Sequence, residues 1–142
     1  MKPRKTTAPH LPIWRDAQRM LVWTEQAVRH FARYHKYTVG SQLRVQALAV
    51  CRLVIRAQAT EASARFEVVA ELHLAAEEMK LLLQMGKEIQ AFRGWAEFEQ
   101  GVQLALAIAR QAAGWRRALA GRSGKAPATE REGAGALRAE VR

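Results

Sequence analysis

The chain has 142 residues, one cysteine and a formal net charge of +10. This length fits one domain that buries its own core, and a lone Cys51 excludes an internal disulfide. No apolar run approaches the length of a membrane span and residues 1–12 contain no hydrophobic signal region, so we expect a cytoplasmic protein. The positive charge favours a polyanionic partner.

Residues 1–12 contain three prolines and three basic side chains, which predict a flexible basic arm. From residue 13 to about residue 35, apolar residues recur every three or four positions and predict a helix. Basic residues gather on its opposite side and just beyond its end, at Arg15, Arg29, Arg33 and Lys36. A charged stripe is usually a solvated helix back, but Asp16 and Glu25 are too few to neutralise this one.

A second helix is predicted from Thr38, as its N-cap, to about Thr60. Its core face is formed by residues spaced for one side of a helix, namely Leu43, Ala47, Val50, Val54 and Ala57. Roughly opposite lie Arg44, Arg52 and Arg56, with no acidic residue in the same helix to pair with them. Cys51 has apolar neighbours, which favours a small buried hydrophobe over a reactive thiol.

Two further helices, at residues 62–92 and 95–119, each show more than one apolar face. Their expected core residues are Val68, Val69, Leu72, Ala75, Ala76, Met79 and Leu83 in the first, and Trp95, Phe98, Val102, Ala105, Leu106, Ala109 and Ala113 in the second. The surplus apolar residues of the last three helices are Leu48, Cys51, Ile55, Leu74, Leu81, Met85, Leu104, Ile108 and Trp115. We interpret these as a subunit interface; the alternative is a merely apolar surface.

Residues 120–142 are rich in glycine, alanine and charge, which predicts a disordered tail. No useful stretch alternates with period two, so no sheet is expected. The sequence therefore predicts an all-α, up-down-up-down antiparallel four-helix bundle over residues 13–119 that assembles into a ring or barrel-like homo-oligomer.

No catalytic, metal or cofactor site is predicted. The four histidines lack a glutamate three residues before them, as a di-iron bundle would require, and there is no phosphate loop or Cys/His cluster. The carboxylates of residues 62–92 are expected on a solvated or pairing face rather than as an acid and base.

Nucleic acid is the expected partner, because the basic backs of two adjacent antiparallel helices can merge into one surface for a phosphate backbone. Such binding would be poorly sequence-specific and strongly weakened by salt. Tyr34 and Tyr37 could stack on unpaired bases, although packing in the core or turn is the commoner role of such residues.

Three stretches in this order, YTVGSQLRVQALAV, LHLAAEEMKLLLQMGKEI and LALAIARQAAGWRRAL, resemble the accessory variability determinant (Avd) family of diversity-generating retroelements. That family lies within a wider group of four-helix bundles that includes ribosomal intervening-sequence proteins. The resemblance covers about residues 11–119. Lys80 and Arg110 match positions where the family carries basic residues, and Arg116 follows the Gly114–Trp115 pair as a basic residue does there.

The resemblance implies a homopentameric barrel that binds the reverse transcriptase of its element and the template RNA, and supports mutagenic retrohoming without being the polymerase. Family positions differ here at Phe31–Ala32–Arg33, at Gln84 and at Ala113–Gly114. Two other interpretations stay open: a generic RNA-binding, ribosome-associated bundle, and a structural adaptor that binds no nucleic acid. A neighbouring reverse-transcriptase gene would distinguish the first interpretation from the second.

Overall fold

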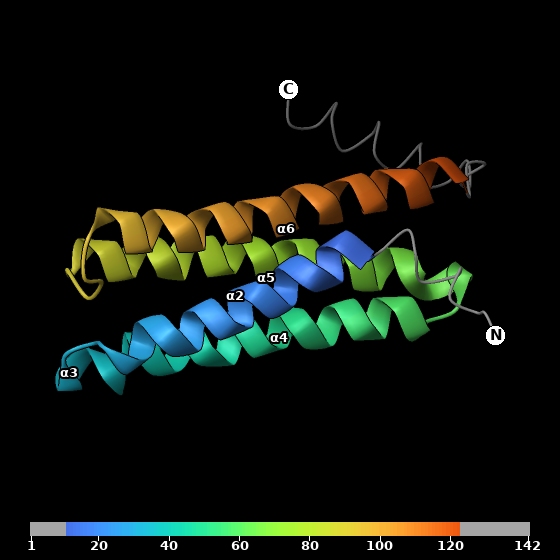
Figure 1. Cartoon of the computed structure of the whole chain (residues 1–142). Coiled ribbons are helices and arrows are strands. Elements are labelled where there is room, and N and C mark those ends of the chain that lie inside the picture. Colours follow the sequence, from blue (N-terminus) through green and yellow to red (C-terminus); the bar gives the residue numbers. More distant parts are fainter. Residues whose placement is uncertain (1–10, 123–142) are drawn as a thin grey trace, which may run out of the picture.

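Residues 11–122 are described by the computed structural model, and they form helices with no strand among them. Four long helices, α2 (Leu11–Arg29), α4 (Val39–Ala59), α5 (Ala62–Glu88) and α6 (Trp95–Arg122), pack together, and α3 (Arg33–Lys36) is one short turn. Figure 1 shows that successive long helices run in opposite directions. The predicted all-α antiparallel four-helix bundle is confirmed for this part of the chain.

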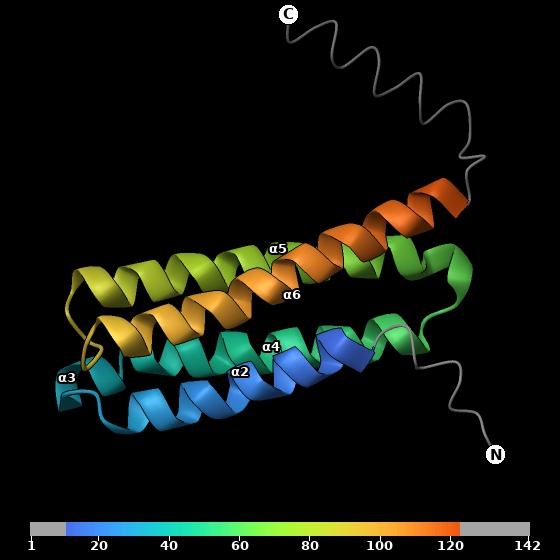
Figure 2. The ribbon, with the colours of Figure 1, turned by 45° about the horizontal axis from the view of Figure 1, so that its top comes forward.

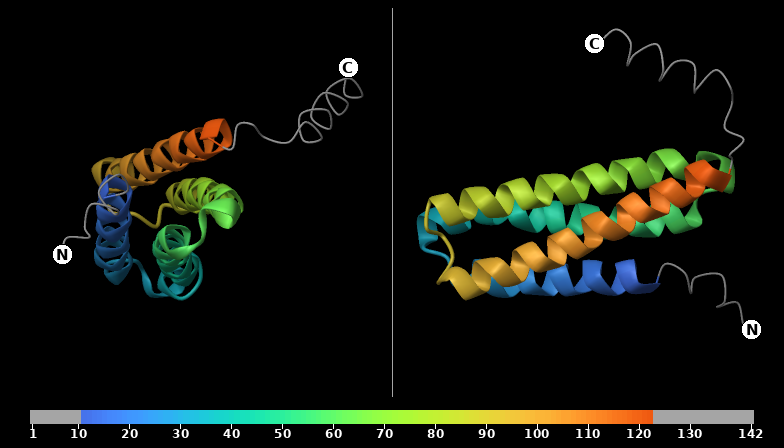
Figure 3. Two further views of the ribbon diagram at one scale, coloured as in Figure 1. Left: turned by 90° about the vertical axis from the view of Figure 1, so that its right-hand side faces the viewer. Right: turned by 90° about the horizontal axis from the view of Figure 1, so that it is seen from above.

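The four long helices surround one core in the cyclic order α2, α4, α5, α6. Each packs against the next along the chain, and α6 returns to pack against α2. Viewed from the end, α2 lies opposite α5, and α4 lies opposite α6 (Figure 3). Every helix therefore has two close neighbours and buries a broad arc of its surface.

The predicted arm at residues 1–12 and the predicted tail at residues 120–142 lie mostly outside the described residues. Where they overlap, the chain is helical: α2 already begins at Leu11 and α6 continues to Arg122. Pro12 is tolerated there because the first turn of a helix has no partner for its backbone N–H groups.

The core contains most of the residues expected from the apolar periodicity. Met20, Leu43, Leu72 and Met79 are all completely inaccessible to solvent. Burying side chains of this size stabilises the fold by roughly 1.5–3 kcal/mol each. The prediction that Trp95 lies in the core is wrong. Its side chain is 63% exposed, because Trp95 is the first residue of α6 and lies at the end of the bundle.

The first long helix ends at Arg29, six residues before its predicted end near His35. The backbone N–H of His30 and that of Phe31 donate to carbonyls three residues back, at Ala27 and Val28, which tightens the last turn. Ala32 is then extended, with φ −57° and ψ 151°, and α3 follows. Figure 2 shows α3 at the end of the bundle where α5 joins α6.

Thr38 does not form the predicted side-chain cap of α4. Its hydroxyl donates instead to the Tyr34 carbonyl oxygen at 2.9 Å and ties the end of α3 to the start of α4. Nearby, a Cβ placed on Gly40 would lie 2.9 Å from a methyl of Val28 and 3.3 Å from Phe31. Only glycine permits α4 to begin this close to the end of α2.

The third long helix ends at Glu88, before the predicted Phe92. Gln90 adopts a positive φ of 60°, and the N–H of Ala91 donates back to the Gly86 carbonyl oxygen at 2.9 Å. This left-handed residue reverses the chain as in a Schellman motif. Phe92 consequently turns inward and its ring contacts those of Phe31 and Phe98, with centroid separations of 5.3 and 5.9 Å.

Candidate nucleic-acid interface

Three of the predicted basic residues come together at the end of the bundle near α3. Arg29 on α2, Lys36 on α3 and Arg44 on α4 line one cavity of about 400 Å³, together with Glu25 and Val28. The only carboxylate in this lining is Glu25, whose Oε2 accepts a hydrogen bond from Arg44 Nε at 2.9 Å. The cavity therefore keeps an excess of positive charge that suits an anionic ligand.

Two of the arginines that have no acidic residue in their own helix are paired with acids of neighbouring helices. Arg44 pairs with Glu25 of α2, and Arg56 Nη2 lies 2.7 Å from Glu71 Oε1 of α5. The acids come from neighbouring helices, so inspection of one helix could not find them. All four side chains are about half exposed, and such surface pairs contribute only about 0–1 kcal/mol. A phosphate can compete with pairs this weak.

Arg52 lies on the exposed face of α4 and makes no ion pair with any residue between 11 and 122. Arg33 on α3 is likewise exposed and makes no ion pair within that range. With the cavity residues Arg29, Lys36 and Arg44, they provide five cations on the half of the bundle formed by α2, α3 and α4.

The remaining predicted cations lie elsewhere. Arg15 lines a groove between α2 and α6, while Arg110 is exposed and Arg116 half-buried on α6. Lys80 on α5 is held by Glu77, 3.1 Å from its Nζ. The ten predicted basic residues therefore lie on all four long helices and α3, and three of them, Arg29, Lys36 and Arg44, line one cavity.

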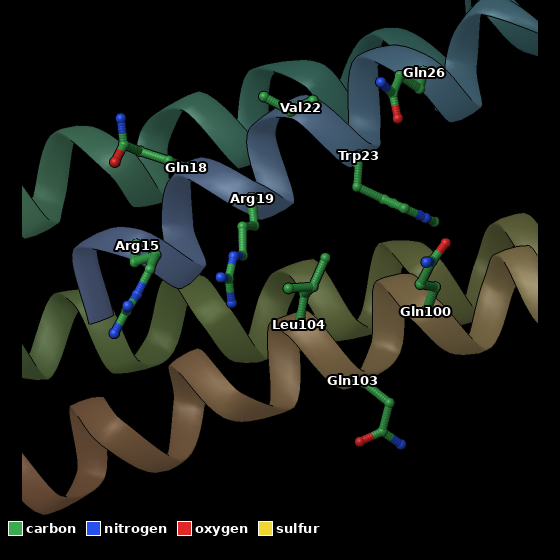
Figure 4. A pocket seen from close by; sticks show the side chains of 9 residues that line it. All are labelled: Arg15, Gln18, Arg19, Val22, Trp23, Gln26, Gln100, Gln103 and Leu104. Atoms are coloured by element: carbon green, nitrogen blue, oxygen red, sulfur yellow. The ribbon is translucent and has the colours of Figure 1, made fainter. Parts of the chain in front are cut away.

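The groove between α2 and α6 was not predicted. Figure 4 shows amide side chains along both helices and the guanidinium groups of Arg15 and Arg19 on α2. Its volume is about 710 Å³, and it is lined by Arg15, Gln18, Arg19, Val22, Trp23, Gln26, Gln100, Gln103 and Leu104. Trp23 is buried at its floor, and its indole Nε1 has no hydrogen-bond partner within residues 11–122. Gly101, a glycine in the middle of α6, was the sequence signal that could have shown where α2 and α6 pack closely together.

The apolar residues assigned to a subunit interface divide into two groups. Exposed apolar side chains occur on α5 at Leu74, Leu81 and Met85 and on α4 at Leu48 and Ile55, with Leu81 69% exposed. These five remain available to a second subunit.

Cys51, Ile108 and Trp115 were also assigned to that interface, and this was wrong, because all three are buried inside the protomer. Leu104 is partly buried against the core and lines the α2–α6 groove. The error has a geometric cause: a bundle helix with two neighbours buries side chains on both flanks of its central stripe.

The expectation that Cys51 is a small buried hydrophobe is confirmed. The Cys51 Sγ lies 3.3 Å from the carbonyl oxygen of Ala17 on α2. Burial raises the pKa of its thiol to about 11. The neutral thiol is thus the form that the fold stabilises.

No known family model matches the chain, and no curated protein is significantly similar to it. Among residues 11–122, no group of three His, Cys, Asp or Glu side chains is arranged to hold a metal ion. Of the helices from α2 to α6, none has both the length and the apolar character that crossing a bilayer requires.

Proposed function

We propose that this chain is a non-catalytic, nucleic-acid-binding accessory subunit of a diversity-generating retroelement. It would act in the cytoplasm, bind the reverse transcriptase of the same element and its template RNA, and support mutagenic retrohoming. The observation that carries the proposal is the convergence of Arg29, Lys36 and Arg44 around one cavity with a single carboxylate. The net charge of +10 and the resemblance to the Avd family support it.

Phosphate is the group that this surface fits best. Arg29 and Lys36 make no ion pairs within residues 11–122. Arg44 pairs with Glu25, but because this pair is exposed, a phosphate can replace the carboxylate with little loss of free energy. Guanidinium and ammonium groups bind phosphate oxygens without reading the bases. We therefore propose binding of RNA or DNA with little sequence preference.

We further propose that several copies assemble into a closed ring, for which the family resemblance suggests a pentamer. The outward-facing Leu74, Leu81 and Met85 of α5 support this, since a monomer would leave them in water. Closed symmetry would repeat the basic cavity around the assembly. A modest charge on each subunit would then become a multivalent surface for one nucleic acid chain.

The direct test is a titration of the full-length protein against short RNA and DNA, read by fluorescence anisotropy at increasing salt. If about five phosphates are neutralised, a log–log plot of the binding constant against salt should have a slope of about −4.5 on duplex DNA. An affinity that does not respond to salt would contradict the proposal. Copurification with the reverse transcriptase encoded beside it would distinguish a retroelement subunit from a generic RNA-binding bundle.

A further inference from the structure

We infer that the end of the bundle formed by α3 and the α5–α6 connection is a stacking platform for unpaired nucleotide bases. This inference rests on the proposed nucleic-acid binding and goes beyond it, because it specifies single-stranded segments as the ligand. The platform is defined by three aromatic side chains, Tyr34, Tyr37 and Trp95.

Exposure of all three aromatic rings is the first observation. Tyr34 is 75%, Tyr37 68% and Trp95 63% exposed, whereas the tryptophans Trp23 and Trp115 are buried. The commoner role of the two tyrosines, packing into the core or turn, is therefore not the one they have here. Rings held this far out in water are available to stack on a planar ligand.

A chain of ring contacts links the residue just before α3 to Trp95 at the start of α6. Phe31, just before α3, contacts Phe92, which contacts Phe98, and the Phe98 ring lies 5.2 Å from that of Trp95. Figures 1 and 3 show that α3 and the start of α6 lie at the same end of the bundle. The exposed Trp95 ring thus rests on a packed aromatic cluster. The exposed Tyr34 lies in α3 and Tyr37 directly follows it, at the same end of the bundle.

The charge around the rings specifies the occupant. Residues 29–38 contain Arg29, Arg33 and Lys36 and no acidic residue. On the other side, the Nζ of Lys87 lies 5.7 Å from the Trp95 ring centroid. Aromatic rings interleaved with cations are the arrangement that binds single strands, because bases stack on the rings while the cations hold the backbone. A purely apolar partner would not require these cations.

The ring of Trp95 is also held in a fixed orientation. Its indole Nε1 donates to Glu99 Oε1 at 3.1 Å, one turn further along α6. A ring with a fixed orientation loses less conformational freedom when a base stacks on it.

The test compares the Tyr34→Ala/Tyr37→Ala protein with the Tyr34→Phe/Tyr37→Phe protein, which keeps both rings. A short single-stranded RNA and the duplex of the same sequence serve as probes. We expect the alanine pair to bind the single strand about tenfold more weakly with an unchanged salt slope, and the phenylalanine pair to bind like the unmodified protein. Duplex affinity should be unchanged in both.

Trp95 supplies a second measurement that needs no change to the tyrosines. The single strand should quench tryptophan fluorescence of the unmodified protein, and Trp95→Phe should abolish most of that quenching. The inference is overturned if the alanine pair binds the strand normally, if both tyrosine pairs lose affinity equally, or if the alanine pair changes the native mass, which would assign the rings to a subunit contact. If one of these results is obtained while the unmodified protein still binds nucleic acid in a salt-dependent way, the proposed function stands and only the stacking inference fails. If the unmodified protein binds no nucleic acid, the proposed function and the stacking inference are both refuted.

Discussion

The indole ring of Trp23 on α2 lies directly against the backbone of Gly101 on α6. A Cβ built on Gly101 would lie 2.3 Å from the nearest indole carbon, much closer than any real Cβ contact. The bundle closes here, where its first and last long helices meet, and glycine is what lets the large ring fit. The same crossing forms the floor of the groove shown in Figure 4.

Gly101→Ala should therefore destabilise the bundle by about 1–3 kcal/mol, because the indole ring has to move out of a packed position. Gly114→Ala in the same helix is a matched control, since its Cβ would meet nothing nearer than 3.9 Å. Alanine there should stabilise α6 by up to about 1 kcal/mol. Chemical denaturation measures both, and equal effects of the two changes would show that the crossing is not tight.

Ionisation of Cys51 should make stability depend on pH in the alkaline range. Its folded-state pKa of about 11 lies above the ordinary value of 9.0, so between these values the unfolded thiol loses its proton while the folded one keeps it. The free energy of unfolding should then fall as the pH rises from 9 to 11.

Other groups also titrate in that range, so the comparison is with Cys51→Ala. The stability difference between the two proteins should shrink with rising pH by on the order of 1–2 kcal/mol. A difference that stays constant across this range would mean that the thiol is no less solvated in the folded protein than in the unfolded one.

Replacement of Gln90 by glycine should stabilise the protein. At a φ of 60° a side chain is unfavourable by about 1–2 kcal/mol, whereas glycine adds only about 0.4–1 kcal/mol of unfolded-state entropy. We expect a net gain of roughly 0.5 kcal/mol in thermal or chemical unfolding. Loss of stability would show that Gln90 makes contacts worth more than its backbone strain.

Leu81→Glu should lower the native mass measured by light scattering while leaving the helical circular dichroism unchanged. The side chain is 69% exposed on a protomer, so a charge is harmless there unless a second subunit covers it. Val22→Glu, at a 54% exposed position on α2, is the control and should leave the mass unaltered. Identical masses for all three proteins would remove α5 from the proposed interface.

Apolar periodicity was enough to predict the four long helices and most of their core, because burial of one face dominates helix placement in a bundle. It failed where tertiary neighbours decide the outcome. Cys51 and Ile108 flank the central stripes and are buried by the second neighbouring helix.

The candidate site was less predictable than the fold. That Arg29, Lys36 and Arg44 share a cavity follows from the chain turning sharply after Phe31, which periodicity across residues 13–35 conceals. The partner of Arg44, Glu25, lies nineteen positions away on another helix. Charge patterns within single helices cannot reveal such pairs.

The central claim, that the cations near α3 bind nucleic acid phosphates, is tested most directly by two charge-matched double variants. Arg29→Glu/Lys36→Glu alters the proposed site, and Arg19→Glu/Arg117→Glu makes the same change in net charge at exposed positions outside it. The measurement is the affinity for single-stranded RNA as a function of salt. We predict that the first variant binds more than about tenfold more weakly, with a salt slope reduced by about 1.4 for two lost contacts, and that the second retains the slope of the unmodified protein. Equal losses in both variants would contradict the account.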